Sequence, residues 1–237
     1  MSPIHIHASP GDVAPFVLLP GDPGRARYVA ERFLKSPKLY NENRGLLGYT
    51  GEFEGVLVSV QTTGMGTPSA AIVVEELIQL GAKHLIRIGT AGSLRPEVKP
   101  LDLVVPTSAV AADGTTRQYL KGRPFSPAPS YPLFRALSQA AGEGALFGTI
   151  VTEDAFYATT PEEAREWAAY GALAVEMESA VIFLLAGMRG VEAASVLTVS
   201  NYVGDPEFVP PEKMARAVER MVAVALEAVV RRSKNGI

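Results

Sequence analysis

LIRIGTAGSL, residues 85–94, is the stretch that decides the fold. Apolar residues dominate Leu85–Ile88 and small residues follow at once, a pattern typical of a strand that is buried on both faces and ends in a tight turn over Gly89–Gly92. Comparable apolar runs recur along the chain, so that the predicted strands are Phe16–Leu19, Val56–Thr62, His84–Ile88, Leu103–Pro106, Leu146–Thr152, Ala172–Val175 and Ala193–Val199.

Segments with helical spacing of apolar residues alternate with these strands. Proline stands near the start of three of them, where its missing N–H does no harm, and the last carries one apolar stripe that is expected to dock on the sheet. The predicted helices are Gly24–Phe33, Pro68–Leu80, Leu133–Ala141, Pro161–Tyr170, Glu178–Arg189 and Pro211–Arg232. This alternation predicts a single α/β domain over residues 1–237, with a mixed, twisted sheet covered by helices on both faces.

Composition excludes several classes of function. The chain has 237 residues, 47% of them hydrophobic, and a net charge of −3, so no basic face for nucleic acid is expected. It has no cysteine and three histidines without paired spacing, which argues against a metal site. The start lacks the basic and apolar regions of a secretory signal, and no apolar run can span a bilayer. We therefore expect a soluble, cytoplasmic protein without a membrane partner.

Two glycine-containing segments suggest a site for an anion. Arg87 interrupts an apolar strand, and a buried arginine needs a counter-ion or a bound anion; Thr90 adds a hydroxyl nearby. In LLPGDPGRA, residues 18–26, a strand ends at Gly21 and Arg25 lies in the first turn of a helix, which suits phosphate. The alternatives are a structural ion pair for Arg87 and an ordinary strand-to-helix turn with a solvated Arg25.

Three further segments offer groups for an organic ligand. Glu178 follows a strand and can accept hydrogen bonds from neighbouring sugar hydroxyls, although it or Glu176 can also serve only as a helix N-terminal carboxylate or a structural partner. Asn201, at the end of a buried strand, can bind the edge of a base or simply cap the strand. Phe156 can stack on a base or belong to the core.

Together these segments resemble the nucleoside phosphorylase superfamily, and specifically the bacterial hexameric purine nucleoside phosphorylases. The matching stretches lie in the family's order over nearly the whole chain. They are His5, PGDPGRAR (20–27), NENRGLLGYTG (41–51), TTGMGTPSA (62–70), RIGTAGSL (87–94), EDAFY (153–157), AVEMESA (174–180) and VSN (199–201).

The resemblance implies phosphorolysis of a purine ribonucleoside to the free base and α-ribose 1-phosphate. It implies no metal or organic cofactor, inorganic phosphate being a co-substrate. It also implies a homo-oligomer whose smallest active unit is a dimer and whose usual form is a hexamer, a trimer of dimers, because Arg44 and His5 resemble residues that a neighbouring subunit supplies.

The resemblance further implies a role for each matching residue. Arg87, Glu178 and Asn201 are expected to be catalytic. The expected phosphate ligands are Gly21, Arg25, Arg44, Arg87 and Thr90; the ribose contacts are His5, Met65, Met177 and Glu178; the base contacts are Phe156, Val175, Ser200 and Asn201.

One departure from the family bears on the base. Many hexameric members carry Asp where this chain has Asn201, and an assisting Arg where Met214 stands here, beside Lys213. An amide cannot protonate a leaving purine, so a preference for 6-oxopurines, inosine and guanosine, is expected. An adenosine-preferring enzyme remains an alternative.

Other classes stay open as well. A uridine phosphorylase is less favoured because FYATTPEEAREW, residues 156–167, lacks the Gln-x-Arg pair of that family. A Rossmann-type dehydrogenase would need a full G-x-G-x-x-G loop, which Gly89 and Gly92 do not provide. A nucleoside-binding protein without catalysis is a third alternative, because a fold does not guarantee chemistry.

Overall fold

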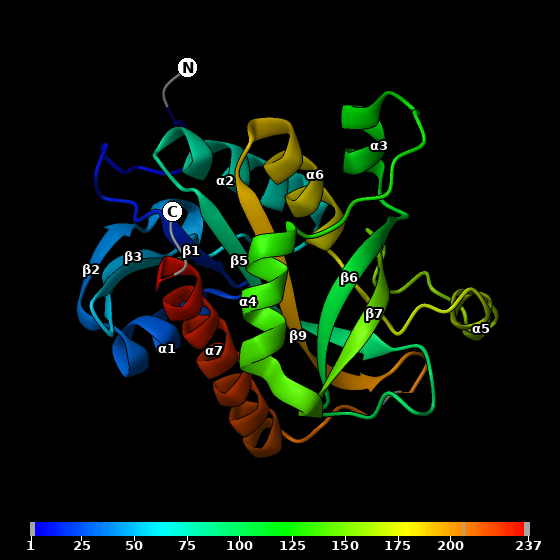
Figure 1. Cartoon of the computed structure of the whole chain (residues 1–237). Coiled ribbons are helices and arrows are strands. Elements are labelled where there is room, and N and C mark those ends of the chain that lie inside the picture. The colour runs from blue at the N-terminus through cyan, green and yellow to red at the C-terminus, as the bar shows by residue number, and fades with distance from the viewer. Residues whose placement is uncertain (1–2, 206, 235–237) are drawn as a thin grey trace.

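Strand β5 (His84–Ser93) runs through the middle of a nine-stranded mixed sheet in the computed structural model, which describes residues 3–205 and 207–234 (Figure 1). The strand order is β2-β3-β4-β1-β5-β8-β7-β6-β9, and β9 pairs with β5 as well. Strands β5, β8, β7, β6 and β9 therefore close into a ring. The other strands are β1 (Phe16–Leu19), β2 (Lys35–Asn41), β3 (Gly48–Phe53), β4 (Val56–Gln61), β6 (Leu103–Ala111), β7 (Ala145–Thr152), β8 (Ala174–Glu176) and β9 (Glu192–Tyr202).

Helices cover both faces of this sheet, as the sequence predicted. They are α1 (Pro23–Phe33), α2 (Thr67–Gln79), α3 (Gly114–Leu120), α4 (Tyr131–Ala141), α5 (Pro161–Ala169), α6 (Ser179–Arg189) and α7 (Pro211–Lys234), with short 3-10 turns at Asn43–Gly45 and Gly142–Gly144. Side chains alternate along β5: Leu85 packs in the core beneath α2 and α6, whereas Ile86 and Ile88 pack in the core beneath α1, α4 and α7. This alternation turns Arg87 toward the side of α2 and α6.

The last helix docks on the sheet as expected. Its buried stripe includes Met221, Ala225 and Val229, which pack in the same core as α1 and α4. Near its C-terminal end, Arg232 donates two hydrogen bonds of 2.8 and 2.9 Å to the carboxylate of Glu192 at the start of β9. In the described part of the chain, no helix has the length and apolar character needed to cross a membrane.

The expected turn at Gly89–Gly92 is wrong, because these residues continue β5. Gly89 and Thr90 pair with β9, and Gly92 pairs with Val175 of β8. Hydrogen bonding to strands on both sides keeps the backbone extended despite the glycines. Asn201, expected at the end of its strand, lies within β9 and pairs with Gly92 of β5.

Three elements were not predicted: β2, β3 and α3. The first five residues of β2 are exposed, so its sequence carries no apolar strand signal, and it pairs with β3 in an antiparallel arrangement. α3 is only seven residues long and begins with an Asp113 side-chain cap on the N–H of Thr116 at 2.6 Å. Short, exposed elements depend on pairing and capping more than on hydrophobic periodicity.

Candidate functional site

A cavity of about 900 Å³ opens where several strands end. β1 leads into it at Gly21, β5 contributes Arg87 to Gly92, β8 contributes Val175 and Glu176, and β9 contributes Ser200 and Asn201. In sheets of this kind, ligands gather at the carboxyl ends of strands. With the single exception of His5, every residue predicted to form the site lines this cavity.

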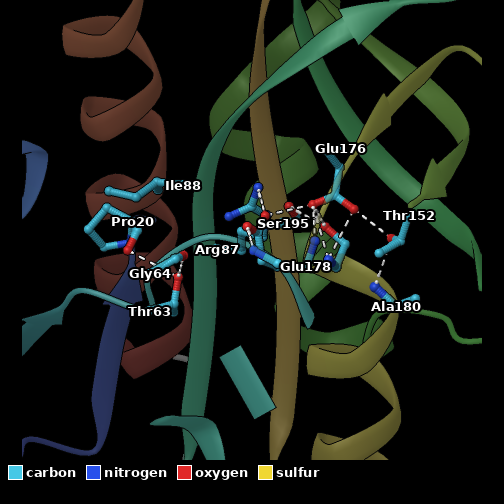
Figure 2. Close-up of polar contacts among 12 residues, drawn as sticks. Pro20, Thr63, Gly64, Arg87, Ile88, Thr152, Glu176, Glu178, Ala180 and Ser195 are labelled. Atoms are coloured by element: carbon cyan, nitrogen blue, oxygen red, sulfur yellow. Dashed lines mark hydrogen bonds and ion pairs between the residues drawn. The ribbon is translucent and has the colours of Figure 1, made fainter. Parts of the chain in front are cut away.

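Arg87 lies at the floor of the cavity with only 3% of its surface exposed. Its Nε donates to Glu176 Oε2 at 2.7 Å, and its Nη2 forms an ion pair with Glu178 Oε2 (Figure 2). Its Nη1 is buried and has no hydrogen-bond partner. Arg87 therefore has structural ion pairs, and Nη1 is a donor nitrogen that can still bind a ligand.

Glu176 is the residue whose importance the sequence did not resolve. Besides Arg87, its fully buried carboxylate accepts a hydrogen bond from the Thr152 hydroxyl at 2.5 Å and bonds of 3.0 Å from the N–H groups of Glu178 and Ser179 (Figure 2). It thus serves as the carboxylate at the N-terminus of α6 and as the partner of Arg87. The sequence shows both glutamates in the motif Glu176-Met177-Glu178, but it does not show which of them faces the cavity.

Glu178 faces the cavity from the start of α6 and is itself 3% exposed. Its Oε1 accepts the N–H of Gly66 at 2.7 Å, just before α2, while its Oε2 pairs with Arg87. Each carboxylate oxygen has a second lone pair, so Glu178 can still accept a hydroxyl. Burial raises the pKa of Glu178, and the charge of Glu176 adds to this, against the opposing effects of Arg87 and the Gly66 N–H.

Positive charge gathers along one side of the cavity. Arg25 lies in the first turn of α1 and donates from Nη1 to the carbonyl of Ile88 at 3.2 Å. Arg44 reaches the cavity from an exposed 3-10 turn, in which its φ of 56° is in the left-handed region. Gly21 permits a close backbone approach, because a Cβ there would meet the Gly64 carbonyl oxygen at 3.1 Å. With Thr90 these groups make a site suited to a tetrahedral oxyanion.

Other residues that line the cavity are apolar or carry a hydroxyl or an amide. They include Met65, Phe156, Val175, Met177, Ser200 and Asn201. The Ser200 hydroxyl donates to Asn201 Oδ1 at 2.9 Å, and Asn201 Nδ2 donates to the Tyr202 carbonyl at 2.9 Å. These bonds orient the amide and leave Nδ2 a second hydrogen that no described residue accepts. Phe156 can stack on a flat ring, and Asn201 Nδ2 can donate a hydrogen bond to the edge of that ring.

The sequence missed two aromatic residues at the mouth of the cavity. Tyr157 and Phe208 both line it, and Tyr157 is almost fully exposed. The loop that carries Phe156 and Tyr157 is held at its base by Glu153, which accepts the Trp167 indole N–H at 2.9 Å and the Thr159 hydroxyl at 2.5 Å. Neither Lys213 nor Met214 lines the cavity.

His5 lies outside its own chain's cavity. Its ring Nδ1 is 2.8 Å from Glu76 Oε1 on α2, and its carbonyl accepts a hydrogen bond from Asn43 at 3.0 Å. Asn43 immediately precedes Arg44, so the two residues expected to act on a neighbouring subunit are connected by one hydrogen bond within this chain. Arg44, in contrast to His5, does line the cavity of its own chain.

The described residues contain no group of three or more His, Asp or Glu side chains arranged to hold a metal ion.

Comparisons with known proteins agree over nearly the whole chain. The family model of the phosphorylase superfamily matches residues 15–231. The chain is similar to curated proteins named "Purine nucleoside phosphorylase DeoD-type": 42% identical over 231 residues to that of Clostridium perfringens strain SM101, covering 96% of this chain and 98% of that protein. The corresponding protein of Caldanaerobacter subterraneus subsp. tengcongensis is 45% identical over 228 residues, covering 94% and 98%. That of Geobacillus kaustophilus is 43% identical over 232 residues, covering 96% and 98%.

The charge arrangement predicts that anion binding takes up a proton. Arg87 is already paired with both Glu176 and Glu178, so an anion at Arg87 Nη1 places extra negative charge beside Glu178 and raises its pKa further. The Glu176 carboxylate already accepts hydrogen bonds from the Thr152 hydroxyl and from the N–H groups of Glu178 and Ser179. Sulfate is the probe, because it does not titrate near neutral pH. Calorimetric titration in buffers of different protonation enthalpy should show proton uptake that grows as the pH falls toward the pKa of Glu178.

Glu178→Gln should abolish this uptake, and Glu153→Gln, a matched change in another carboxylate that lines the cavity, should leave it unchanged. Uptake that persists in the Glu178→Gln protein would show that another group takes the proton.

Proposed function

The chain belongs to the phosphorylase superfamily, and we propose that it is a purine nucleoside phosphorylase that cleaves purine ribonucleosides with inorganic phosphate. The products are the free base and α-ribose 1-phosphate. The enzyme is a pentosyltransferase, and the reaction is reversible. The observation that carries the proposal is the unpartnered Nη1 of buried Arg87, in a cavity that is also lined by Arg25 and Arg44 and by apolar residues and the oriented amide of Asn201.

The chemistry requires two oppositely charged regions on either side of the sugar. As the C1′–N9 bond breaks, its electron pair leaves with the base and the sugar becomes cationic. A phosphate oxygen then forms the new bond to C1′ from the opposite face. Phosphate ordered by Arg25, Arg87 and Thr90 stabilises the cationic sugar and is in position to attack. No cofactor takes part in this proposal, and phosphate is a co-substrate.

The remaining site residues divide between sugar and base. We assign Gly21 and Arg44 to phosphate as well; Met65, Met177, Glu178 and His5 to ribose; and Phe156, Val175, Ser200 and Asn201 to the base. Support for a ribose role of Glu178 comes from its remaining lone pairs and from its place in the cavity lining, where it contacts both Arg87 and the N–H of Gly66. A carboxylate there can accept from both the 2′- and 3′-hydroxyls.

We propose that 6-oxopurine nucleosides are preferred. The negative charge of a leaving 6-oxopurine spreads over O6 and N7, and the second hydrogen of Asn201 Nδ2 can be donated there. Adenine has no O6, so its departure depends more on an acid at N7, which an amide cannot be. An amide can pair with the N6 and N7 edge of adenine, so the preference is expected in turnover more than in binding.

We further propose a cytoplasmic homo-oligomer with shared sites, most simply a hexamer built as a trimer of dimers. Support comes from His5, which lies outside its own chain's cavity although it belongs to the matching motif set. Arg44 is connected to it through Asn43. Because this hydrogen bond holds His5 and Arg44 close together, both residues can reach the same site of one neighbouring subunit.

Loss of Arg87 should remove most of the turnover. Arg87→Ala should lower kcat/KM for inosine on the order of 10²-fold or more, because a charged contact to phosphate in the transition state is lost. Steady-state assays with varied phosphate measure this, and the wild type should release no base without phosphate. Arg87→Lys reports on charge with less structural change, and Arg95→Ala, a partly exposed ion-paired arginine outside the cavity, is the matched control. Phosphorolysis at the wild-type rate in Arg87→Ala would contradict the assignment.

Subunit mixing tests the shared sites. Arg44→Ala and Glu178→Ala proteins should each be nearly inactive, but verified mixed oligomers should regain part of the activity, because some sites then pair a native Glu178 with a native Arg44 from the neighbour. If Arg44 serves only its own chain's cavity, no native combination forms and activity stays low.

A change at Asn201 tests the base preference. Asn201→Asp, alone and with Met214→Arg, should raise the kcat of adenosine relative to that of inosine, because a carboxylic acid can protonate N7. Rates for both nucleosides should be compared across pH 5–8, with Tyr202→Phe as a control on the same strand that does not line the cavity. A wild type that cleaves adenosine as fast as inosine would refute the role given to Asn201 and leave the phosphorylase assignment standing.

A further inference from the structure

Glu76, within helix α2, holds the segment that carries His5. Its carboxylate accepts the backbone N–H groups of three successive residues: Ile4 at 3.0 Å, His5 at 2.9 Å and Ile6 at 2.7 Å. It also contacts the His5 ring, with 2.8 Å between Nδ1 and Oε1. In Figure 1 the dark-blue start of the described chain lies near α2, and Ile6 is 70 residues away from Glu76 in sequence. The Glu76 side chain therefore holds both the backbone N–H and the ring of His5 in position.

This contact selects one form of the imidazole. An ionised carboxylate has only acceptors, so Nδ1 of His5 must carry the hydrogen. Burial opposes ionisation of Glu76, but the hydrogen bonds from the His5 ring and from the backbone of Ile4 to Ile6 outweigh it and lower the pKa of Glu76. In a neutral ring, Nε2 is then the acceptor. None of the described residues of this chain is hydrogen-bonded to it, and the side chain is 27% exposed.

A second anchor fixes the direction of the segment. Asn43 donates to the His5 carbonyl at 3.0 Å, and Asn41 accepts the His7 N–H at 2.9 Å. His5 is thus held from α2 on one side and from the turn of Arg44 on the other. This second attachment means that loss of Glu76 should release the ring without freeing the whole segment.

We propose that Glu76 is a positioning residue that sets the tautomer and direction of His5, so that His5 Nε2 accepts the 5′-hydroxyl of the nucleoside. The inference rests on the proposed function, in which His5 contacts the ribose. A carboxylate behind a histidine commonly fixes which ring nitrogen faces the ligand. The alternative is that Glu76 only stabilises the N-terminal segment, and the two ideas differ in measurable ways.

The activity test compares inosine with 5′-deoxyinosine, which lacks only the 5′-hydroxyl. The wild type should prefer inosine in kcat/KM, and both His5→Ala and Glu76→Gln should lower that preference roughly tenfold, the size typical of one lost hydrogen bond. The kcat/KM for 5′-deoxyinosine should stay near the wild-type value. Glu75→Gln is the matched control: Glu75 is the preceding residue on α2, and its carboxylate binds Arg189 at 2.7 and 2.8 Å and does not touch His5.

A spectroscopic test does not depend on turnover. The chain has three histidines, so ¹⁵N-histidine labelling gives three ring systems, and loss of one in His5→Ala identifies His5. The wild-type ring should show hydrogen on Nδ1, which Glu76→Gln should shift toward the mixture of tautomers of a free imidazole. Glu75→Gln should leave the spectrum of His5 unchanged.

The outcomes separate the ideas. Equal loss of activity on both substrates in Glu76→Gln, an unchanged preference for inosine, or an unchanged His5 spectrum would each overturn the positioning role. Thermal midpoints and oligomer size, measured for every variant, identify a purely structural effect. If the wild type fails to cleave inosine with phosphate, the proposed function itself is wrong and so is the 5′-hydroxyl role of His5, while the spectra still decide whether Glu76 sets the ring.

Discussion

The buried charge of Arg87 is the constraint on which the rest of the site depends. A guanidinium with 3% exposure must have counter-charges, and the two available carboxylates come from the same short segment, Glu176 and Glu178. To reach Arg87, that segment must leave β8 and start α6 directly beside β5. Removing one partner of such a buried pair typically costs about 3–5 kcal/mol, because it leaves an unpaired charge.

The same contacts connect elements that are distant in sequence. Glu178 also binds the N–H of Gly66 at the start of α2, and Thr67 donates to Asp154 at 2.7 Å, at the base of the loop that carries Phe156. Further along α2, Glu76 holds the segment of His5. The helix therefore connects the buried ion pair to the mouth of the cavity and to the N-terminal segment, so that binding groups of different kinds are arranged around one rigid element.

The cavity is lined by arginines and also by apolar and amide side chains, so it can accommodate an anion beside a flat organic ring. Arg25 and Arg87 attract the anion, and Glu176 and Glu178 are the counter-charges of buried Arg87. A buried positive charge without such partners would be costly to maintain. Asn201, already oriented by Ser200, places a neutral donor in the same cavity.

Much of the fold and of the site was determined by the sequence itself. Apolar runs and helix spacing predicted the α/β class, most strands and six of the helices, because burial on both faces leaves a local pattern. The ordered motifs from His5 to Asn201 indicated the family and the residues that line the cavity. Tertiary structure alone decided that Gly89–Ser93 stays extended, that the exposed β2 forms a strand, and that Glu176 and Glu178 are the counter-charges of Arg87. It also decided that His5 is held by Glu76 outside its own cavity. Each of these depends on hydrogen bonds or ion pairs between residues far apart in the chain, which leave no periodic signal in the sequence.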